Sequence, residues 1–308
     1  MSTSLQKTSP VPTDRALDLG GTVIVIFLCM CWGLNQIAIK YALPDIPPLT
    51  QAAIRSSGAA ILIWLYARAR GISLEMRDPT LAAGVLVGSL FALEFALLYW
   101  GLIYTTASRA VLFLYLAPFV VVLGSYFRQG SDRFDWMQWA GLLMSFLGMA
   151  IAFGFPGPDT TREQIIGDAM IFGAAVAWGL TTLAVKGTSL AAASPEKTLQ
   201  YQLVISAPVF MILAWLFGEQ INNSPSALAM YSMIYQTVWV VAFTFVLWFT
   251  LVAKYSANRL SAYTLLTPLF GVAAGHFVLG DPFTPAFAAA VILVIAGLAV
   301  VNRQKKTR

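Results

Sequence analysis

WGLNQIAIK, residues 32–40, is repeated in this chain as WGLTTLAVK at residues 178–186. Five of the nine positions are identical, and the two stretches lie 146 residues apart in a chain of 308. Similarity at a fixed offset close to half the chain length is typical of an internal duplication. A second motif repeated in the same order would separate duplication from chance similarity.

The second motif is present. ASR at residues 107–109 precedes Pro118, and ANR at residues 257–259 precedes Pro268, with the same spacing from arginine to proline in both copies. The offset of this pair, 150 residues, is close to that of the first pair. Together the two pairs predict that the chain consists of two related halves.

The composition is that of a membrane protein. Hydrophobic residues make up 58% of the chain and charged residues 11%, and the mean hydropathy is +0.74. Soluble domains carry about 25% charged residues, so a polytopic membrane protein is predicted. In such a protein the location of lysines and arginines matters more than their sum, and the net charge of +5 does not indicate nucleic-acid binding. Cys29 and Cys31 lie in one apolar segment and fit neither a disulfide nor a metal site. We predict no cofactor and no metal, the lipid bilayer and a small molecule as partners, and a chain compatible with a monomer.

Charged residues divide the chain into ten apolar segments of a length suited to a bilayer, which needs about 20 residues per helix. The predicted spans are residues 19–39, 49–67, 79–99, 104–127, 136–153, 168–187, 198–218, 229–252, 258–279 and 284–301. The predicted fold is therefore an all-α polytopic membrane protein. Its expected parts are an N-terminal cytoplasmic tail (1–18), a first five-helix repeat (19–154), a connecting loop (155–167), a second five-helix repeat (168–301) and a basic cytoplasmic tail (302–308).

The distribution of positive charge predicts the orientation. If the N-terminus is cytoplasmic, 15 of the 19 lysines and arginines fall on the cytoplasmic side, and only Lys40 and Arg162 fall outside. This bias follows the positive-inside rule and places both termini in the cytoplasm. Because each half has an odd number of spans, the second half enters the membrane from the opposite side. Inverted repeats of this kind are typical of secondary transporters, which bind substrate near the bilayer midplane.

These motifs resemble the drug/metabolite transporter superfamily, EamA type. The resemblance rests on the Trp-Gly pair in the first span of each half, the A-x-R…P pattern, and the glycines Gly141, Gly148 and Gly297 in the last spans. Within that superfamily the chain is most similar to the YddG-type exporters of aromatic amino acids. The resemblance implies a secondary transporter of the bacterial inner membrane. It would export small metabolites, including aromatic amino acids, by alternating access around a cavity between the repeats.

Other functions fit the residues less well. Another member of the superfamily could carry a drug, a nucleotide sugar or a lipid-like metabolite, but a phosphate group would call for basic side chains within the cavity. An intramembrane enzyme needs a nucleophile with a base, or a metal cluster. The chain has one histidine and two cysteines in unsuitable positions. A structural scaffold would not explain an inverted duplication.

Three charged residues lie inside predicted spans and away from the span ends: Arg55, Glu94 and Arg109. Charged groups at membrane depth are costly and are candidates for function. From the helical rise we expect all three in the outer half of the bilayer. They would form one charge cluster, in which Glu94 either neutralises an arginine or takes part in holding a substrate carboxylate or carrying a proton.

The remaining candidates are polar, aromatic or helix-breaking. His276 could titrate near neutral pH in a coupled step, or make one hydrogen bond between helices. Pro118 and Pro268 should kink their spans, as static bends or as hinges. Polar and aromatic side chains deep in the spans either pack or line a cavity that would suit a flat apolar solute. These are Asn35, Gln36, Thr181, Thr182, Tyr99, Trp178, Tyr201, Trp239, Trp248 and Tyr263.

Overall fold

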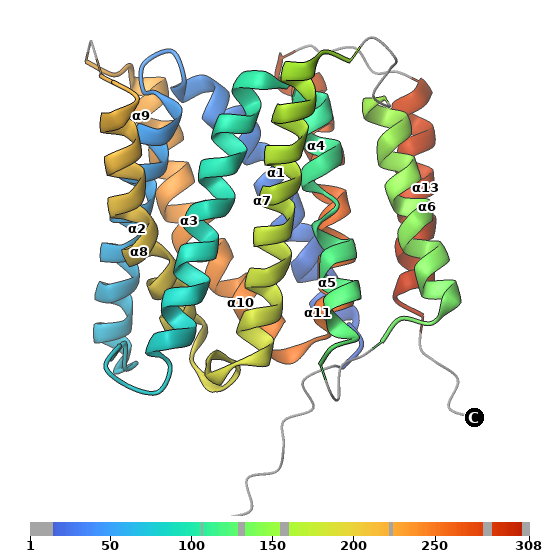
Figure 1. Ribbon diagram of the computed structural model, residues 1–308, viewed down its shortest axis with the longest axis horizontal. Helices are drawn as coiled ribbons and strands as arrows, with labels where there is room; N and C mark the ends of the chain where they lie inside the picture. The colour runs from blue at the N-terminus through green and yellow to red at the C-terminus, as the bar shows by residue number, and fades with distance from the viewer. Residues whose placement is uncertain are drawn as a thin grey trace, which may run out of the picture.

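The computed structural model describes residues 15–105, 107–128, 133–154, 160–221, 224–279 and 285–303. Within these ranges the chain forms helices and no β-strand (Figure 1). In the first half the helices are α1 (Leu19–Ala42), α2 (Pro48–Arg70), α3 (Leu81–Tyr104), α4 (Ala107–Leu114), α5 (Ala117–Ser125) and α6 (Trp136–Phe153). In the second half they are α7 (Arg162–Gly187), α8 (Pro195–Leu216), α9 (Ala227–Ile234), α10 (Phe245–Lys254), α11 (Ala257–Tyr263), α12 (Thr267–Ala274) and α13 (Pro285–Val301).

Short segments of other helix types join some of these helices. Two are 3₁₀ turns, η1 (Ser189–Ala192) and η3 (Thr264–Leu266), and two are π-helical, η2 (Tyr235–Thr244) and η4 (Gly275–Leu279). Because η2 continues from α9 into α10, the chain is helical without a break from Ala227 to Lys254. The predicted span at 229–252 is thus a single long helix of mixed type.

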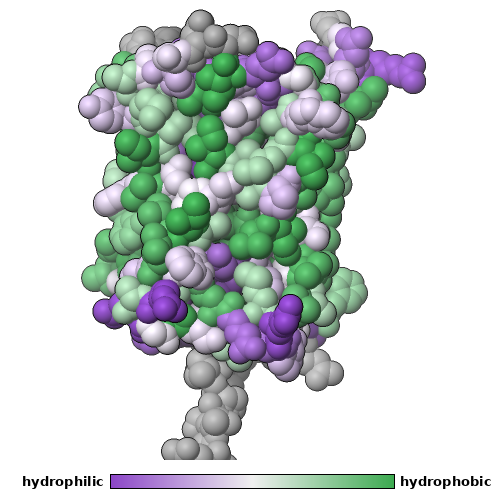
Figure 2. Space-filling view, turned by 90° about the vertical axis from the view of Figure 1, so that its left-hand side faces the viewer, coloured by the Kyte–Doolittle hydropathy of each residue, from purple (hydrophilic) through white to green (hydrophobic). Residues whose placement is uncertain are grey.

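Seven of the described helices are long and apolar enough to cross a membrane. They are α1, α3, α6, α7, α8, the helix Ala227–Lys254 and the helix Ala257–Val278, and two shorter apolar helices are Arg109–Ser125 and Pro285–Val301. Figure 2 shows what this composition does to the surface. Apolar side chains cover the middle of the viewed face, and hydrophilic ones gather toward its two ends. A bundle with an apolar waist and polar ends is the form that a bilayer requires.

Local capping explains where α7 begins. The Thr161 hydroxyl accepts from the backbone N–H of Gln164, and the Gln164 side chain accepts from the backbone N–H of Thr161. Such a reciprocal capping box fixes a helix start. As a result α7 begins at Arg162, earlier than the predicted 168 and inside the range 155–167 assigned to the connecting loop. Residues 155–159 of that loop, and most of the two terminal tails, lie outside the described residues.

Glycines let the helices approach closely where the repeated motif occurs. A Cβ at Gly33 in α1 would lie 2.7 Å from the backbone nitrogen of Gly271 in α12. A Cβ at Gly179 in α7 would lie 2.6 Å from the side chain of Val120 in α5. Neither contact leaves room for a side chain at the glycine. The glycine of the Trp-Gly motif therefore lets α1 pack closely on α12 and α7 pack closely on α5.

The helices that carry the two predicted kinks are interrupted next to their prolines. α4 ends at Leu114, and Pro118 lies in the first turn of α5. α11 is followed by the 3₁₀ turn η3, and Pro268 lies in the first turn of α12. A proline lacks the N–H that a helix interior needs but is tolerated in a first turn. Each interruption therefore leaves the proline at the start of a new helix.

We call the end of the bundle where α3 and α8 begin the lower end, and the end where α2 and α7 begin the upper end, as they appear in Figure 1. At the lower end Lys197, at the start of α8, forms an ion pair with Asp78, just before α3. The Tyr201 hydroxyl reaches the same segment, at 3.0 Å from the Thr80 hydroxyl and 3.2 Å from the Met76 carbonyl oxygen. These contacts tie α8 to the segment before α3.

We call these contacts of Lys197 and Tyr201 with the segment before α3 the lower tie, and its ion pair should weaken only in strong acid. Hydrogen bonds from Lys197 and then Thr80 lower the pKa of Asp78 to about 2. A carboxyl whose pKa is lower in the folded state stabilises the fold above its unfolded pKa, about 3.9. That stabilisation is lost as pH falls through the folded value. We expect the difference in Tm between the wild-type protein and Asp78→Asn to be constant from pH 8 to about 5 and to shrink from about pH 4 to 2. A difference that changes near neutral pH would contradict this assignment.

Candidate functional site

A cavity of about 240 Å³ lies inside the bundle. It is lined by side chains from both halves of the chain: Trp32, Asn35, Gln36, Ile39, Arg55, Phe91, Glu94, Phe95, Leu98, Tyr99, Leu102, Leu114, Tyr115, Trp178, Thr181, Thr182, Gln202, Val240, Phe245, Trp248, Phe249 and Thr267. Concave sites with mostly apolar walls and a few placed polar groups are typical of small-molecule binding. The lining is of that kind.

The lining residues recur at helical spacing. On α1 they are Trp32, Asn35, Gln36 and Ile39, and the same pattern of third and fourth neighbours occurs on α3, α7 and α10. Residues three and four apart lie on one face of a helix. Each of these helices therefore turns one continuous stripe toward the cavity.

Aromatic rings form a continuous chain along one wall. The ring centroids of neighbouring members lie 4.9 Å apart for Phe91 and Phe95, 6.4 Å for Phe91 and Phe245, and 5.9 Å for Phe245 and Trp32. The chain continues from Trp32 to Trp248 at 5.4 Å. A separate pair, Tyr115 and Trp178 at 5.7 Å, contributes to the lining from α7 and the α4–α5 break. Such rings offer a large apolar contact surface with a defined geometry.

Two opposite charges face this cavity without forming an ion pair with each other. Arg55 and Glu94 are 4% and 9% exposed. Among the described residues, neither has a side-chain hydrogen bond or a salt bridge to protein. The Arg55 guanidinium instead lies over the Phe95 ring, 4.5 Å from its centroid. Buried charges are normally paired, so this arrangement leaves both charges available to a ligand.

Further polar atoms of the lining have no protein partner in the described structure. They are Asn35 Oδ1, Arg55 Nη2 and Gln202 Oε1. All three side chains are more than nine-tenths buried. Since buried polar groups are normally hydrogen-bonded, three such atoms in one cavity indicate that it receives a polar molecule.

The cavity lies toward the upper end. Its lining reaches Ile39 and Leu102, in the last turns of α1 and α3. At the other extreme it stops at Phe249, five residues before α10 ends, or about 7.5 Å above the lower end by the helical rise. The central cavity thus ends before it reaches the lower end.

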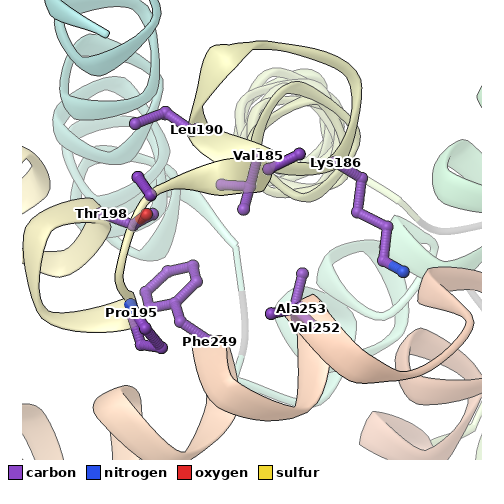
Figure 3. A pocket seen from close by; sticks show the side chains of 10 residues that line it. Val185, Lys186, Leu190, Pro195, Thr198, Phe249, Val252 and Ala253 are labelled. Atoms are coloured by element: carbon purple, nitrogen blue, oxygen red, sulfur yellow. The ribbon is translucent and has the colours of Figure 1, made fainter. Parts of the chain in front are cut away.

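Phe249 also lines a second, much smaller cavity of about 20 Å³ at the lower end. Figure 3 shows its ring beside Pro195 and Thr198, while the Lys186 ammonium points away from the ring. A space of this size holds about one water molecule. The buried ring of Phe249, 6% exposed, therefore separates the central cavity from the lower end.

The structure brings nine predicted site residues together at the cavity: Asn35, Gln36, Arg55, Glu94, Tyr99, Trp178, Thr181, Thr182 and Trp248. Tyr201, Trp239, Tyr263 and His276 lie outside its lining. Tyr201 belongs to the lower tie, and the Trp239 indole N–H donates to Cys31 Sγ at 3.4 Å. The Tyr263 carbonyl accepts from Cys29, and His276 lies 5.2 Å from the Phe277 ring.

Arg109 does not join Arg55 and Glu94. Its guanidinium forms an ion pair with Asp168 of α7, and the Thr105 hydroxyl donates to the same carboxylate at 2.7 Å. Arg109 Nη1 also donates to the Thr160 hydroxyl at 3.1 Å. The expected cluster of three charges is therefore divided into a buried ion pair that joins α4 to α7 and a separate pair of charges in the cavity.

Several lining residues were not among the predicted site residues. They include Phe91, Phe95, Phe245 and Phe249, together with Gln202 and Thr267. Phe95 and Phe91 precede Tyr99 by four and eight residues and share its face. The spacing of aromatic residues on one face of 81–104 would have identified them.

Comparison with known proteins agrees with this architecture. The model of the EamA-like transporter family matches the chain twice, over residues 19–154 and 165–303. The chain belongs to this family. It is accordingly a multi-pass membrane transporter, and the family indicates transport rather than enzymatic catalysis. The second match begins 146 residues after the first, which is the offset of the repeated Trp-Gly motif.

The individual relatives have low sequence identity to this chain. The chain is 28% identical to the uncharacterized transporter YvbV of Bacillus subtilis, over 93% of this chain and 92% of that protein. It is 24% identical to a probable amino-acid metabolite efflux pump of Salmonella typhimurium, over 89% and 92%. One solved crystal structure has a TM-score of 0.80 at 21% identity and covers 92% of this chain and 97% of its own. At this identity the similarity shows a shared fold.

Proposed function

We propose that this transporter exports amino acids, aromatic ones included, from the bacterial cytoplasm across the inner membrane. One observation carries the proposal: Arg55 and Glu94 face an aromatic-lined cavity without pairing with each other. An amino acid is a zwitterion with one group for each charge. The similarity to the probable amino-acid metabolite efflux pumps of Salmonella typhimurium and Escherichia coli supports the direction and the substrate class.

The proposed architecture is ten spans in two inverted five-helix repeats. Three observations support it: the double family match, the recurrence of helix starts and the two glycine crossings. α2 and α8 both begin with proline, at Pro48 and Pro195, and α4 and α11 begin at Ala107 and Ala257. The pairing of helices repeats as well, since α1 packs on α12 as α7 packs on α5. In this arrangement the lower end is cytoplasmic.

Alternating access then requires the lower barrier to open and the upper end to close. Phe249 forms the lower barrier, and an offset of 150 residues relates it to Tyr99, which lines the cavity nearer the upper end. In a symmetric scaffold the two rings are equivalent. We propose that Tyr99 closes the upper end when Phe249 withdraws.

Uptake into proteoliposomes tests the proposed function. Purified protein is reconstituted and supplied with a panel of labelled amino acids, with and without an imposed pH gradient. We expect saturable uptake of aromatic amino acids that protein-free liposomes do not show. Dependence on the pH gradient would identify a coupled proton. Absence of saturable uptake for every amino acid would refute the proposed substrate class and leave the family membership intact.

A further inference from the structure

The two proposed repeats contribute equivalent positions to the cavity but not equivalent charges. Aligning α2 with α8 by their initial prolines places Arg55 opposite Gln202, and an offset of 150 residues relates Glu94 to Thr244. Arg55, Glu94 and Gln202 line the cavity, while the Thr244 hydroxyl accepts from the Trp32 indole N–H at 2.9 Å. Both charges of the cavity thus come from the first repeat, and their counterparts are neutral.

One aromatic position of the lining shows the opposite asymmetry. The offset of 150 residues relates Leu98 of α3 to Trp248 of α10. Trp248 stacks edge-on against Trp32, at 5.4 Å between centroids, and extends the aromatic chain toward the lower end. The first repeat therefore supplies a charged pole, and α10 of the second repeat supplies a deeper aromatic surface.

Depth along the helices separates the two poles. Arg55 lies seven residues into α2, about 10 Å below the upper end, and Glu94 lies about 15 Å below it. Trp248 lies six residues before the end of α10, about 9 Å above the lower end. A molecule that reaches both poles must point its charged groups up and its apolar part down.

We propose that the cavity binds an α-amino acid in this single orientation, with its carboxylate on Arg55, its ammonium on Glu94 and its side chain against Trp32, Phe245 and Trp248. The inference rests on the proposed function and adds the recognition groups. A guanidinium binds a carboxylate through paired N–H donors. The Phe95 ring holds this guanidinium by its face, and Arg55 Nη2 has no protein acceptor. Arg55 is thus positioned with a free donor.

The ammonium group of the ligand has three N–H donors and needs acceptors. Glu94 supplies a carboxylate, and Asn35 Oδ1 and Gln202 Oε1 are further acceptors of the lining without a protein partner. The cavity therefore contains one group for the carboxylate and several for the ammonium, and its two charges sum to zero. A neutral zwitterion matches this balance, whereas an amine or a carboxylic acid leaves one buried charge uncompensated.

The test compares three ligands that share a phenyl ring: phenylalanine, phenethylamine, which lacks the carboxylate, and 3-phenylpropionate, which lacks the ammonium. Binding is measured by calorimetry on purified protein. Wild-type protein should bind phenylalanine at least about 30-fold more tightly than either analogue. Arg55→Gln, which introduces the residue of the second repeat, should lose about that factor for phenylalanine without weakening the binding of phenethylamine. Glu94→Thr should weaken phenylalanine binding by a similar factor without weakening the binding of 3-phenylpropionate.

Controls separate recognition from general damage. Lys40→Gln removes an exposed cation near the upper end of α1, outside the cavity lining, and should leave all three affinities unchanged. If Arg55→Gln does not fold, Arg55→Lys keeps the charge and should weaken phenylalanine binding while keeping the preference over the amine. Equal weakening for all three ligands, or retained discrimination in folded Arg55→Gln, would overturn the inference. No binding of phenylalanine or any other amino acid to wild-type protein would instead refute the proposed function.

Discussion

Replacing Arg109 by glutamine is expected to lower the free energy of unfolding by about 3–5 kcal/mol, the usual effect of removing one partner of a buried ion pair. The side chains of Arg109 and Asp168 are 12% and 7% exposed. Without the guanidinium, Asp168 keeps the hydrogen bond from Thr105 but loses its counter-charge. The measurement is thermal or denaturant unfolding of purified protein in detergent, followed by size-exclusion chromatography.

A double-mutant cycle identifies the cause. Adding Asp168→Asn to Arg109→Gln removes the uncompensated charge and should recover most of the stability, so the two effects should be far from additive. Arg55→Gln should cost less stability, because Arg55 has no protein ion pair within the described residues. If Arg109→Gln is fully stable but does not transport, Arg109 belongs to the transport path rather than to the scaffold.

Replacing Gly33 by alanine is expected to destabilise the bundle by about 1–3 kcal/mol, as overpacking of a tight contact usually does. The new methyl group would lie 2.7 Å from both the Gly271 backbone nitrogen and the Phe270 Cβ, so α1 and α12 would have to move apart. A lower Tm in detergent would report the change. The larger side chain of Gly33→Leu should prevent recovery of folded protein.

Gly20→Ala is the matched control, because its new methyl group would meet only the Asp18 side chain, at 3.6 Å. It should leave the Tm unchanged. Gly179→Ala should resemble Gly33→Ala, since its methyl group would lie 2.6 Å from Val120. Equal stability of Gly33→Ala and Gly20→Ala would show that the α1–α12 contact is looser than the structure indicates.

Local patterns predicted the parts of the molecule that depend on local physics. The apolar segments correspond to helices, and the residues Asn35, Gln36, Thr181 and Thr182 of the repeated stretch all line the cavity. Periodicity and repetition suffice there, because the face of a helix follows from its own sequence. Glu94 was identified for a similar reason, as a charge inside an apolar segment.

Contacts between distant segments could not be predicted from such local patterns. Nothing near Arg109 indicates that its partner is Asp168, 59 residues away, and depth alone suggested a cluster with Glu94. Tyr201 and Tyr263 are deep and aromatic, as a cavity residue would be, but the tertiary arrangement turns them toward other neighbours. The sequence thus indicated the kind of site better than it indicated which residues line it.

The π-helical segment η2 has a consequence for the evolutionary history of the chain. α9 begins 146 residues after α3 begins, but α10 ends 150 residues after α3 ends, so the second helix has 28 residues against 24. The π-helical residues Tyr235–Thr244 lie between the part of the helix with the offset of 146 residues and the part with the offset of 150. π-turns take up additional residues inside a helix. Four inserted residues could therefore accumulate in one copy after duplication while Phe245, Trp248 and Phe249 continued to face the same cavity.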